Sequence, residues 1–146
     1  MSDAERIARA CADAMWANDK ASQALGMTIE EVALGRATLS MDVQAHMVNG
    51  HDLCHGGYIF TLADSTFAFA CNTYDVVTVA QHCEVTFLNA GKLGDRLTAR
   101  AQERSRKGRS GIYDVTVTRA DGTVIAEFRG LSRTIGGGIL SKKAGG

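Results

Sequence analysis

One segment of the chain, residues 54–72, constrains the fold more than any other. It reads CHGGYIFTLADSTFAFACN, with apolar residues on nearly every side of a helix, two glycines near its start and one acidic residue, Asp64. A helix without a polar stripe has no face to turn towards water, so we predict that this helix is buried all round. The other elements of the chain must then wrap around it.

Asp64 lies where desolvation penalises an ionised carboxylate unless a partner or a chemical task compensates. It is either a structural carboxylate bonded to a neighbouring strand or a functional one. Gly56 and Gly57 favour a function, because they leave the first N–H groups of the helix bare, and such an N-terminus favours developing negative charge. A carboxylate that activates an attack, combined with N–H groups that hold an oxyanion, indicates acyl transfer.

The composition limits the classes of protein to consider. A chain of 146 residues with 45% hydrophobic content fits one domain with a real core, and its 16 basic and 16 acidic residues cancel, so we expect no nucleic-acid partner. No apolar run approaches the roughly 20 residues that span a bilayer, and the N-terminus has no apolar signal core, so we expect no membrane partner and a cytoplasmic protein. The four cysteines lack metal-type spacing and are expected to be reduced thiols.

Periodicity predicts the remaining elements. Residues 2–20 begin with a capping-box pattern and carry apolar residues on one face, which predicts an amphipathic helix. Alternating residues on both sides of Gly35 predict a hairpin of two strands over 26–42. Turn residues separate four further strands, which we expect to form a meander, over 76–88, 96–102, 113–118 and 124–133.

This order of elements predicts an α+β fold, in which an antiparallel β-sheet wraps around one long central helix and a further helix lies at the N-terminus. The arrangement resembles the hotdog fold. We expect a single domain over residues 1–137. Residues 138–146 are rich in glycine and lysine without periodicity, and we expect them to form a disordered tail.

Three motifs make the resemblance specific. They are NGHDLCHGG at 49–57, followed by Asp64 seven residues later, FAFACN at 67–72 and FRG at 128–130. Together they resemble the PaaI-type acyl-CoA thioesterases of phenylacetate degradation, over most of the chain. One departure is the loop at 88–91, where members of that family often have proline, whereas this chain has none. The departure leaves the conformation of the loop open.

The resemblance implies a set of site residues. Asp64 would be the catalytic base or nucleophile, Gly56 would donate its backbone N–H to the thioester carbonyl, and Asn49 would place the water or the substrate. An Asn-Gly turn explains Asn49 equally well. His55 and Gly57 would belong to the substrate-binding region, with His55 capping or rigidifying the start of the helix.

A basic run at 104–109 places four positive charges at a junction between two strands. Most such runs are solvated turns. Hotdog thioesterases usually hold the phosphates of coenzyme A at the protein surface, so the resemblance makes Arg106 and Lys107 the candidate anchor.

Other site chemistries fit the sequence less well. His46, His51, Cys54 and His55 are residue types that bind zinc, but their spacing matches none of the usual ligand pairs, and the resemblance implies no metal. It also implies no cofactor, because coenzyme A is part of the substrate. A Ser-His-Asp hydrolase is disfavoured, since no Gly-x-Ser-x-Gly motif is present.

The leading functional hypothesis is hydrolysis of an acyl-CoA thioester, of an arylacetyl type such as hydroxyphenylacetyl-CoA, to the free acid and coenzyme A. The acyl preference rests on the resemblance alone. The alternatives are a hotdog dehydratase, which needs a histidine acting with the carboxylate, and a non-catalytic domain that binds acyl-CoA. A carboxylate in an apolar helix argues against binding alone. The sequence leaves open whether Asp64 attacks the carbonyl or deprotonates water.

Helix geometry predicts that the site is shared between chains. Gly56 and Asp64 are eight positions apart, which at a rise of about 1.5 Å per residue is roughly 12 Å along the helix axis and too far for one carbonyl. A second antiparallel copy of the helix about a two-fold axis would bring Asp64 of one chain towards Gly56 of the other. We therefore expect a homodimer or homotetramer with sites shared between subunits.

Overall fold

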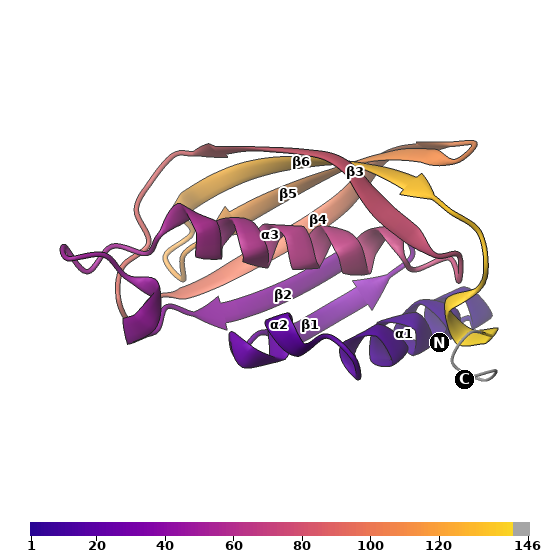
Figure 1. Ribbon diagram of the computed structural model, residues 1–146, viewed down its shortest axis with the longest axis horizontal. Helices are drawn as coiled ribbons and strands as arrows, with labels where there is room; N and C mark the ends of the chain where they lie inside the picture. Colours follow the sequence, from indigo (N-terminus) through magenta and orange to yellow (C-terminus); the bar gives the residue numbers. More distant parts are fainter. Residues whose placement is uncertain (142–146) are drawn as a thin grey trace.

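A computed structural model describes residues 1–141 as a six-stranded antiparallel sheet that curves around one long helix, α3 (Figure 1). The α+β architecture predicted from the sequence is confirmed, including the helix at the N-terminus. The elements in chain order are α1 (Asp3–Trp16), α2 (Lys20–Ala24), β1 (Thr28–Ala33), β2 (Arg36–Asp42), the 3-10 turn η1 (Ala45–Met47), α3 (Gly56–Cys71), β3 (Thr78–Phe87), β4 (Arg96–Lys107), β5 (Ser110–Thr118) and β6 (Val124–Thr134).

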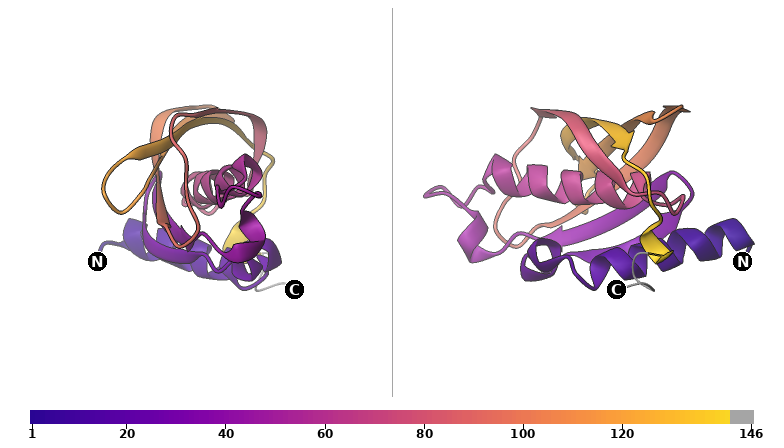
Figure 2. Two further views of the ribbon diagram at one scale, coloured as in Figure 1. Left: turned by 90° about the vertical axis from the view of Figure 1, so that its left-hand side faces the viewer. Right: turned by 45° about the vertical axis from the view of Figure 1, so that its right-hand side comes forward.

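The N-terminal helix begins as predicted but ends earlier. The Glu5 N–H donates to the Ser2 hydroxyl at 3.1 Å, and the Ser2 N–H donates to the Glu5 carboxylate at 3.2 Å, which completes the capping box. Helix α1 stops at Trp16, and Asp19 caps a separate short helix, α2, by accepting from the Ser22 N–H at 3.0 Å. A view along α3 shows the sheet curling around it, with α1 and α2 across the lower side (Figure 2).

The strand order is β1-β2-β4-β5-β6-β3, so the predicted meander is correct for β4 to β6 and wrong for β3. Strand β3 pairs with β6, with Thr78 opposite Thr134 and Phe87 opposite Ala126, and lies at the edge of the sheet. The chain then crosses one end of the sheet over residues 88–95 before β4 joins β2. Alternation identifies a strand but not its partner, so the sequence pattern alone gave no sign of this crossing.

The core lies between the concave face of the sheet and α3. Leu97 and Ala99 of β4, together with Val115 and Val117 of β5, are fully buried at alternating positions. Eight residues of α3 are buried with them, namely Ile59, Leu62, Ala63, Thr66, Phe67, Phe69, Ala70 and Cys71. The helix is therefore the centre of the hydrophobic core, as its composition predicted.

The glycine of the FRG motif allows a close helix–sheet contact. A Cβ atom at Gly130 on β6 would lie 2.7 Å from three ring atoms of Phe67. Real Cβ atoms essentially never approach so closely, so any larger residue at this position would displace Phe67 from the core. The motif thus has a packing role that links β6 to α3.

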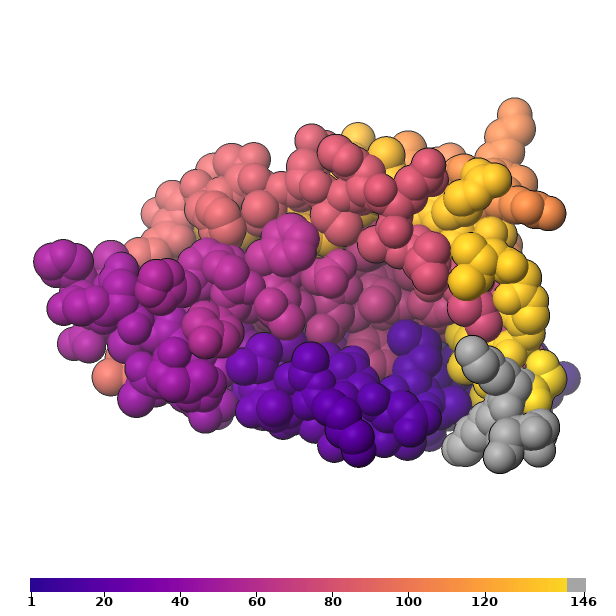
Figure 3. All heavy atoms as spheres, viewed as in Figure 1, coloured from indigo at the N-terminus to yellow at the C-terminus, as the bar shows by residue number. Residues whose placement is uncertain are grey.

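The expectation that α3 is buried all round is wrong for the single chain. The sheet covers only part of the helix, and one face remains accessible, carrying Gly57, Thr61, Asp64, Ser65 and Ala68. Atoms of α3 reach the surface between β3 and the two N-terminal helices (Figure 3). The residues of this face have small side chains spaced three or four apart, which would allow another helix to approach closely.

The C-terminal residues that the structure describes continue past β6. Residues 139–141 lie in a helical turn, and the Leu140 N–H donates to the Asp75 carboxylate at 2.9 Å, so this part of the predicted disordered tail is ordered. Residues 142–146, the rest of that tail, lie outside the described residues. No helix within residues 1–141 is long and apolar enough to cross a membrane.

Candidate active site

The first turn of α3 presents backbone N–H groups that the protein leaves free. His55 is the N-cap residue, but its side chain makes no capping hydrogen bond, so its predicted capping role is wrong. Its own N–H donates to the Met47 carbonyl at 2.8 Å and thereby fixes where the helix begins. The N–H groups of Gly56 and Gly57 have no acceptor within residues 1–141. Such an end of a helix attracts negative charge on a ligand.

An open groove of about 540 Å³ lies beside this helix end. One side is formed by the loop before α3 and the first turn of the helix, and the other side by the end of β3 and the loop after it. Its lining residues are Asn49, Leu53, Cys54, Gly56, Ile59, Phe87, Leu88, Asn89, Ala90 and Gly91. The structure therefore brings together two of the predicted site residues, Asn49 and Gly56.

Asn49 has a structural role and also faces the groove. Its side-chain oxygen accepts from the His51 N–H at 2.9 Å and from the Leu53 N–H at 3.2 Å, which holds the loop before α3 in a tight turn. Its side-chain NH₂ group donates no hydrogen bond within residues 1–141. Both interpretations of Asn49 from the sequence are thus compatible with the structure, because each uses a different atom of the amide.

Asp64 lies in the middle of α3 on the accessible face, half-buried beside β3. The Cys83 thiol of β3 is within hydrogen-bonding distance of its carboxylate, at 3.8 Å from Oδ1. Burial raises the pKa of Asp64, and the contact with Cys83 opposes that rise. Burial also raises the pKa of Cys83 to about 11, with the charge of Asp64 contributing, so this thiol stays protonated and can donate. A carboxylate with a raised pKa is a stronger base than an exposed one.

Cys83 is a site residue that the sequence pattern did not indicate. It lies 19 residues after Asp64 on a different element, and nothing in the local pattern indicates that the two side chains meet. The only available signal was its place in the strand pattern of 76–88, which gives a face of a strand but not the helix residue opposite.

Arg106 and Lys107 do not join the groove within one chain. They lie at the end of β4, and the Arg106 guanidinium stacks over the Tyr74 ring at 3.7 Å from the centroid. Tyr74 follows the C-terminal end of α3, so these two basic residues lie at the opposite end of the helix from Gly56 (Figure 1).

The histidines before α3 do not gather into a metal centre. Within residues 1–141, no group of three or more His, Cys, Asp or Glu side chains could hold a metal ion. The His46 ring instead meets the Tyr58 ring edge-on, with centroids 5.8 Å apart.

Known proteins are similar to this chain in sequence. Residues 51–126 match the sequence profile of the thioesterase superfamily. The acyl-coenzyme A thioesterase PaaI of Escherichia coli (strain K12) is 44% identical over 131 residues, which are 90% of this chain and 94% of that relative.

Solved structures give the same relationship. The E. coli PaaI protein from the phenylacetic acid degradation operon superposes with a TM-score of 0.91 at 42% identity, covering 93% of this chain and 99% of that one. A mutant of the phenylacetic acid degradation protein PaaI from Thermus thermophilus gives a TM-score of 0.76 at 34% identity, covering 79% and 98% of the two chains. The predicted hotdog fold is therefore confirmed.

Proposed function

The chain belongs to the thioesterase superfamily and is an acyl-CoA thioesterase, and we propose that its preferred substrates are arylacetyl thioesters such as hydroxyphenylacetyl-CoA. The observation that carries the proposed chemistry is the start of α3, where the Gly56 and Gly57 N–H groups are free and Gly56 lines the groove. The half-buried Asp64 carboxylate lies on the same helix. The acyl class is supported by the similarity to the E. coli protein from the phenylacetic acid degradation operon.

In the proposed reaction, the start of α3 binds the carbonyl oxygen and Asp64 in the middle of α3 promotes the attack. The Gly56 N–H donates to the thioester carbonyl oxygen, and this hydrogen bond strengthens as negative charge develops on the oxygen. Asp64 removes a proton from the attacking water, or attacks the carbonyl carbon itself. The C–S bond then breaks, and coenzyme A leaves as a thiolate that takes up a proton. The Asn49 NH₂ group would position the water or the substrate from the other side of the groove.

An isotope experiment separates the two routes for Asp64. In a single turnover in oxygen-18 water, a nucleophilic Asp64 forms a mixed anhydride, and water that attacks the aspartyl carbonyl of this anhydride leaves the label in the carboxylate. If Asp64 is a general base, the label enters the free acid only. Mass spectrometry of the peptide that contains Asp64 distinguishes the outcomes.

We further propose that each site is built by two chains. Within one chain, Gly56 and Asp64 are eight positions apart, which corresponds to roughly 12 Å of helix and is too far for attack on a carbonyl held at Gly56. The accessible face of α3 has small side chains on both sides of Asp64, and β3 offers an edge without a neighbouring strand among the described residues. A second chain placed antiparallel against this face would carry its own Asp64 towards Gly56.

Complementation between inactive chains tests the shared site. Chains with Asp64→Asn are mixed with chains that carry Gly56→Trp, under conditions in which subunits exchange. Heterodimers regain one intact site, so we expect about a quarter of wild-type activity at statistical mixing. Absence of recovery, despite exchange proven by native mass spectrometry, would show that one chain builds the whole site.

The proposed anchor for coenzyme A needs the same dimer. Arg106 and Lys107 are exposed and far from Gly56 of their own chain, so they would serve a site formed with the partner. We expect Arg106→Glu combined with Lys107→Glu to raise KM for acyl-CoA more than for the corresponding acyl-pantetheine, which lacks the nucleotide phosphates. Arg100→Glu, also exposed on β4, is the matched control. An unchanged KM in the double variant would remove this anchor.

Release of free thiol from a panel of CoA esters tests the function as a whole. A thioesterase releases thiol from arylacetyl esters without added metal or cofactor, whereas a non-catalytic acyl-CoA-binding domain leaves every ester intact. A dehydratase would consume a hydroxyacyl ester without releasing thiol. Turnover that favours long-chain aliphatic esters over arylacetyl esters would overturn the proposed acyl class while leaving the thioesterase activity in place.

A further inference from the structure

Phe87 lines the groove directly beside Gly56. A Cβ atom at Gly56 would lie 2.8 Å from Cζ of the Phe87 ring and 3.2 Å from two further ring atoms. The ring is therefore in contact with the first turn of α3, where the thioester carbonyl is proposed to lie. Phe87 is nevertheless 49% exposed, so much of its surface faces the groove and water.

The strand end that carries Phe87 is held in place by β6. Phe87 lies opposite Ala126, and the Leu88 and Asn89 N–H groups both donate to the Ile125 carbonyl, at 2.8 and 3.3 Å. These bonds fix the backbone directly after Phe87. The ring therefore lies against Gly56 on a backbone that has little freedom to move away.

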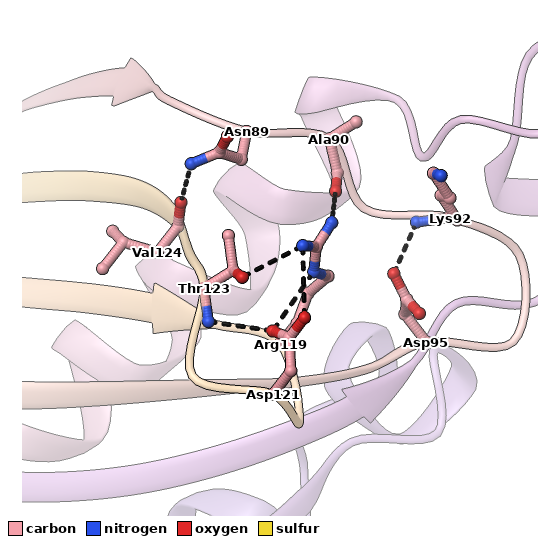
Figure 4. A network of polar contacts seen from close by, with 8 residues as sticks. All are labelled: Asn89, Ala90, Lys92, Asp95, Arg119, Asp121, Thr123 and Val124. Carbon is pink, nitrogen blue, oxygen red and sulfur yellow. Dashed lines mark hydrogen bonds and ion pairs between the residues drawn. The ribbon is translucent and has the colours of Figure 1, made fainter.

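Side-chain hydrogen bonds also hold the loop that follows β3, in the polar network shown in Figure 4. The Asn89 NH₂ donates to the Val124 carbonyl at 2.8 Å, and the Arg119 guanidinium donates to the Ala90 carbonyl at 3.1 Å. Asp121 pairs with the same guanidinium at 3.3 Å and holds it in position. This network holds the loop at 88–91, where PaaI-type thioesterases often have proline. The wall of the groove that this loop forms is therefore preformed.

We propose that Phe87 determines which acyl groups the enzyme accepts, by stacking its ring against an aromatic ring of the acyl chain. Among the described residues that line the groove, Phe87 is the only aromatic one, and its apolar neighbours there are aliphatic or small. In an arylacetyl thioester a single methylene separates the ring from the carbonyl carbon. With the carbonyl held at the Gly56 N–H, this short linkage allows the acyl ring to reach the 4.5–7 Å range of centroid distances at which aromatic pairs interact.

This inference rests on the proposed function, and it makes a narrower claim. An aliphatic side chain at position 87 would still exclude water from the groove, but it would not distinguish an aromatic acyl ring from a saturated one. The proposal therefore concerns the ratio of two substrates of similar size, phenylacetyl-CoA and cyclohexylacetyl-CoA, and not the absolute rate.

The test compares Phe87→Leu with Phe87→Tyr. Aromatic pairing adds a selective contribution that corresponds to roughly 2- to 10-fold in an equilibrium or rate ratio. We expect Phe87→Leu to lower the ratio of kcat/KM for phenylacetyl-CoA over cyclohexylacetyl-CoA by that factor, and Phe87→Tyr to keep it within about 2-fold of wild type. A ratio unchanged in Phe87→Leu, or an equal loss on both esters, would overturn the proposal.

A matched control separates the groove from general effects on β3. Val79 is exposed on the same edge strand at its other end, and Val79→Ala should leave the ratio unchanged. Melting temperature and oligomeric size are measured for every variant, and Phe87→Tyr preserves the ring if Phe87→Leu fails to fold.

A binding measurement keeps the proposal testable if hydrolysis fails. If wild-type protein releases no thiol from either ester, the proposed function is wrong. Calorimetry with the two corresponding non-hydrolysable thioethers then tests Phe87 by itself, because the same change in ratio is expected in Kd. No change in the Kd ratio between wild type and Phe87→Leu would overturn the proposal independently of catalysis.

Discussion

The two ends of α3 differ in whether a side chain of the protein makes hydrogen bonds there. At the C-terminal end, the buried Asn72 side chain donates to the Ala68 and Thr78 carbonyls at 2.9 and 3.0 Å and accepts from the Thr78 N–H at 2.9 Å. At the N-terminal end, the N-cap His55 is exposed and gives no side-chain hydrogen bond to cap the helix. We call the C-terminal end at Asn72 the sealed end, and the N-terminal end at Gly56, which lines the groove, the open end.

This difference assigns different roles to the two ends: the sealed end contributes to the stability of the fold, and the open end contributes to the reaction. A side-chain cap at an N-terminus typically stabilises a protein by about 1 kcal/mol, and α3 lacks that contribution. Because no side chain caps this end, the Gly56 and Gly57 N–H groups stay available to a substrate. We therefore expect changes at the open end and at Asp64 to affect turnover, and changes at the sealed end to affect the free energy of unfolding.

The largest effect is expected for Asp64→Asn. Loss of the acid–base or nucleophilic group should lower kcat by about 10²- to 10⁴-fold, while the fold remains, because removing a half-buried charge need not weaken the core. Thiol-release kinetics and circular dichroism measure the two properties. Near-native turnover would show that the central assignment is wrong.

Gly56→Ala should have the next largest effect. The added Cβ would lie 2.8 Å from the Phe87 ring, so either the ring or the helix start must move, and a displacement of about 1 Å at a reacting centre can cost about 10²-fold in rate. Gly57→Ala is the matched comparison, because its Cβ meets no atom within 4 Å and a smaller loss is expected. If the clash is the cause, adding Phe87→Leu to Gly56→Ala should restore part of the lost kcat.

At the sealed end, Asn72→Ala should reduce stability and spare turnover. Its removal leaves the N–H and the carbonyl of the buried Thr78 without their partner, which corresponds to a loss of about 1–3 kcal/mol in the free energy of unfolding. Urea unfolding measures this loss, with the exposed Asn18→Ala as control. A folded Asn72→Ala protein with a kcat lowered about 10-fold would contradict the division of roles between the two ends.

The smallest effect is a pH dependence of stability at Asp64. Burial raises its pKa above that of the unfolded chain, so the folded state binds the proton more tightly and stability falls as the pH rises through the raised pKa. Asp64→Asn should therefore melt above wild type at neutral pH, with the difference vanishing below the usual range of carboxyl pKa values. Melting curves across this pH range measure the effect.

Asp114 provides a control of opposite sign. Its pKa is lowered, mainly by the Arg129 guanidinium that donates at 2.7 Å, so its contribution to stability is present above the unfolded pKa and is lost as the pH falls. Asp114→Asn should melt slightly below wild type at neutral pH. If both variants shifted in the same direction at neutral pH, the assigned origin of the Asp64 pKa would be wrong.

Local sequence patterns were enough to predict the central helix, the number of strands after it and the location of the helix end that begins with glycine. These follow from local rules, because hydrophobic periodicity and glycine placement act within a few residues of the chain. The same local signals indicated that Asp64 lies in an apolar helix and that the helix end at Gly56 and Gly57 is a candidate oxyanion site.

Which elements contact one another became clear only from the folded chain. It placed β3 beside β6 rather than β4, brought Cys83 to Asp64, and set the Phe87 ring against Gly56. It also left one face of α3 uncovered, although the composition of the helix predicted burial on every side. Each of these depends on contacts between residues distant in the sequence, and periodicity carries no information about the partner that an apolar face finds.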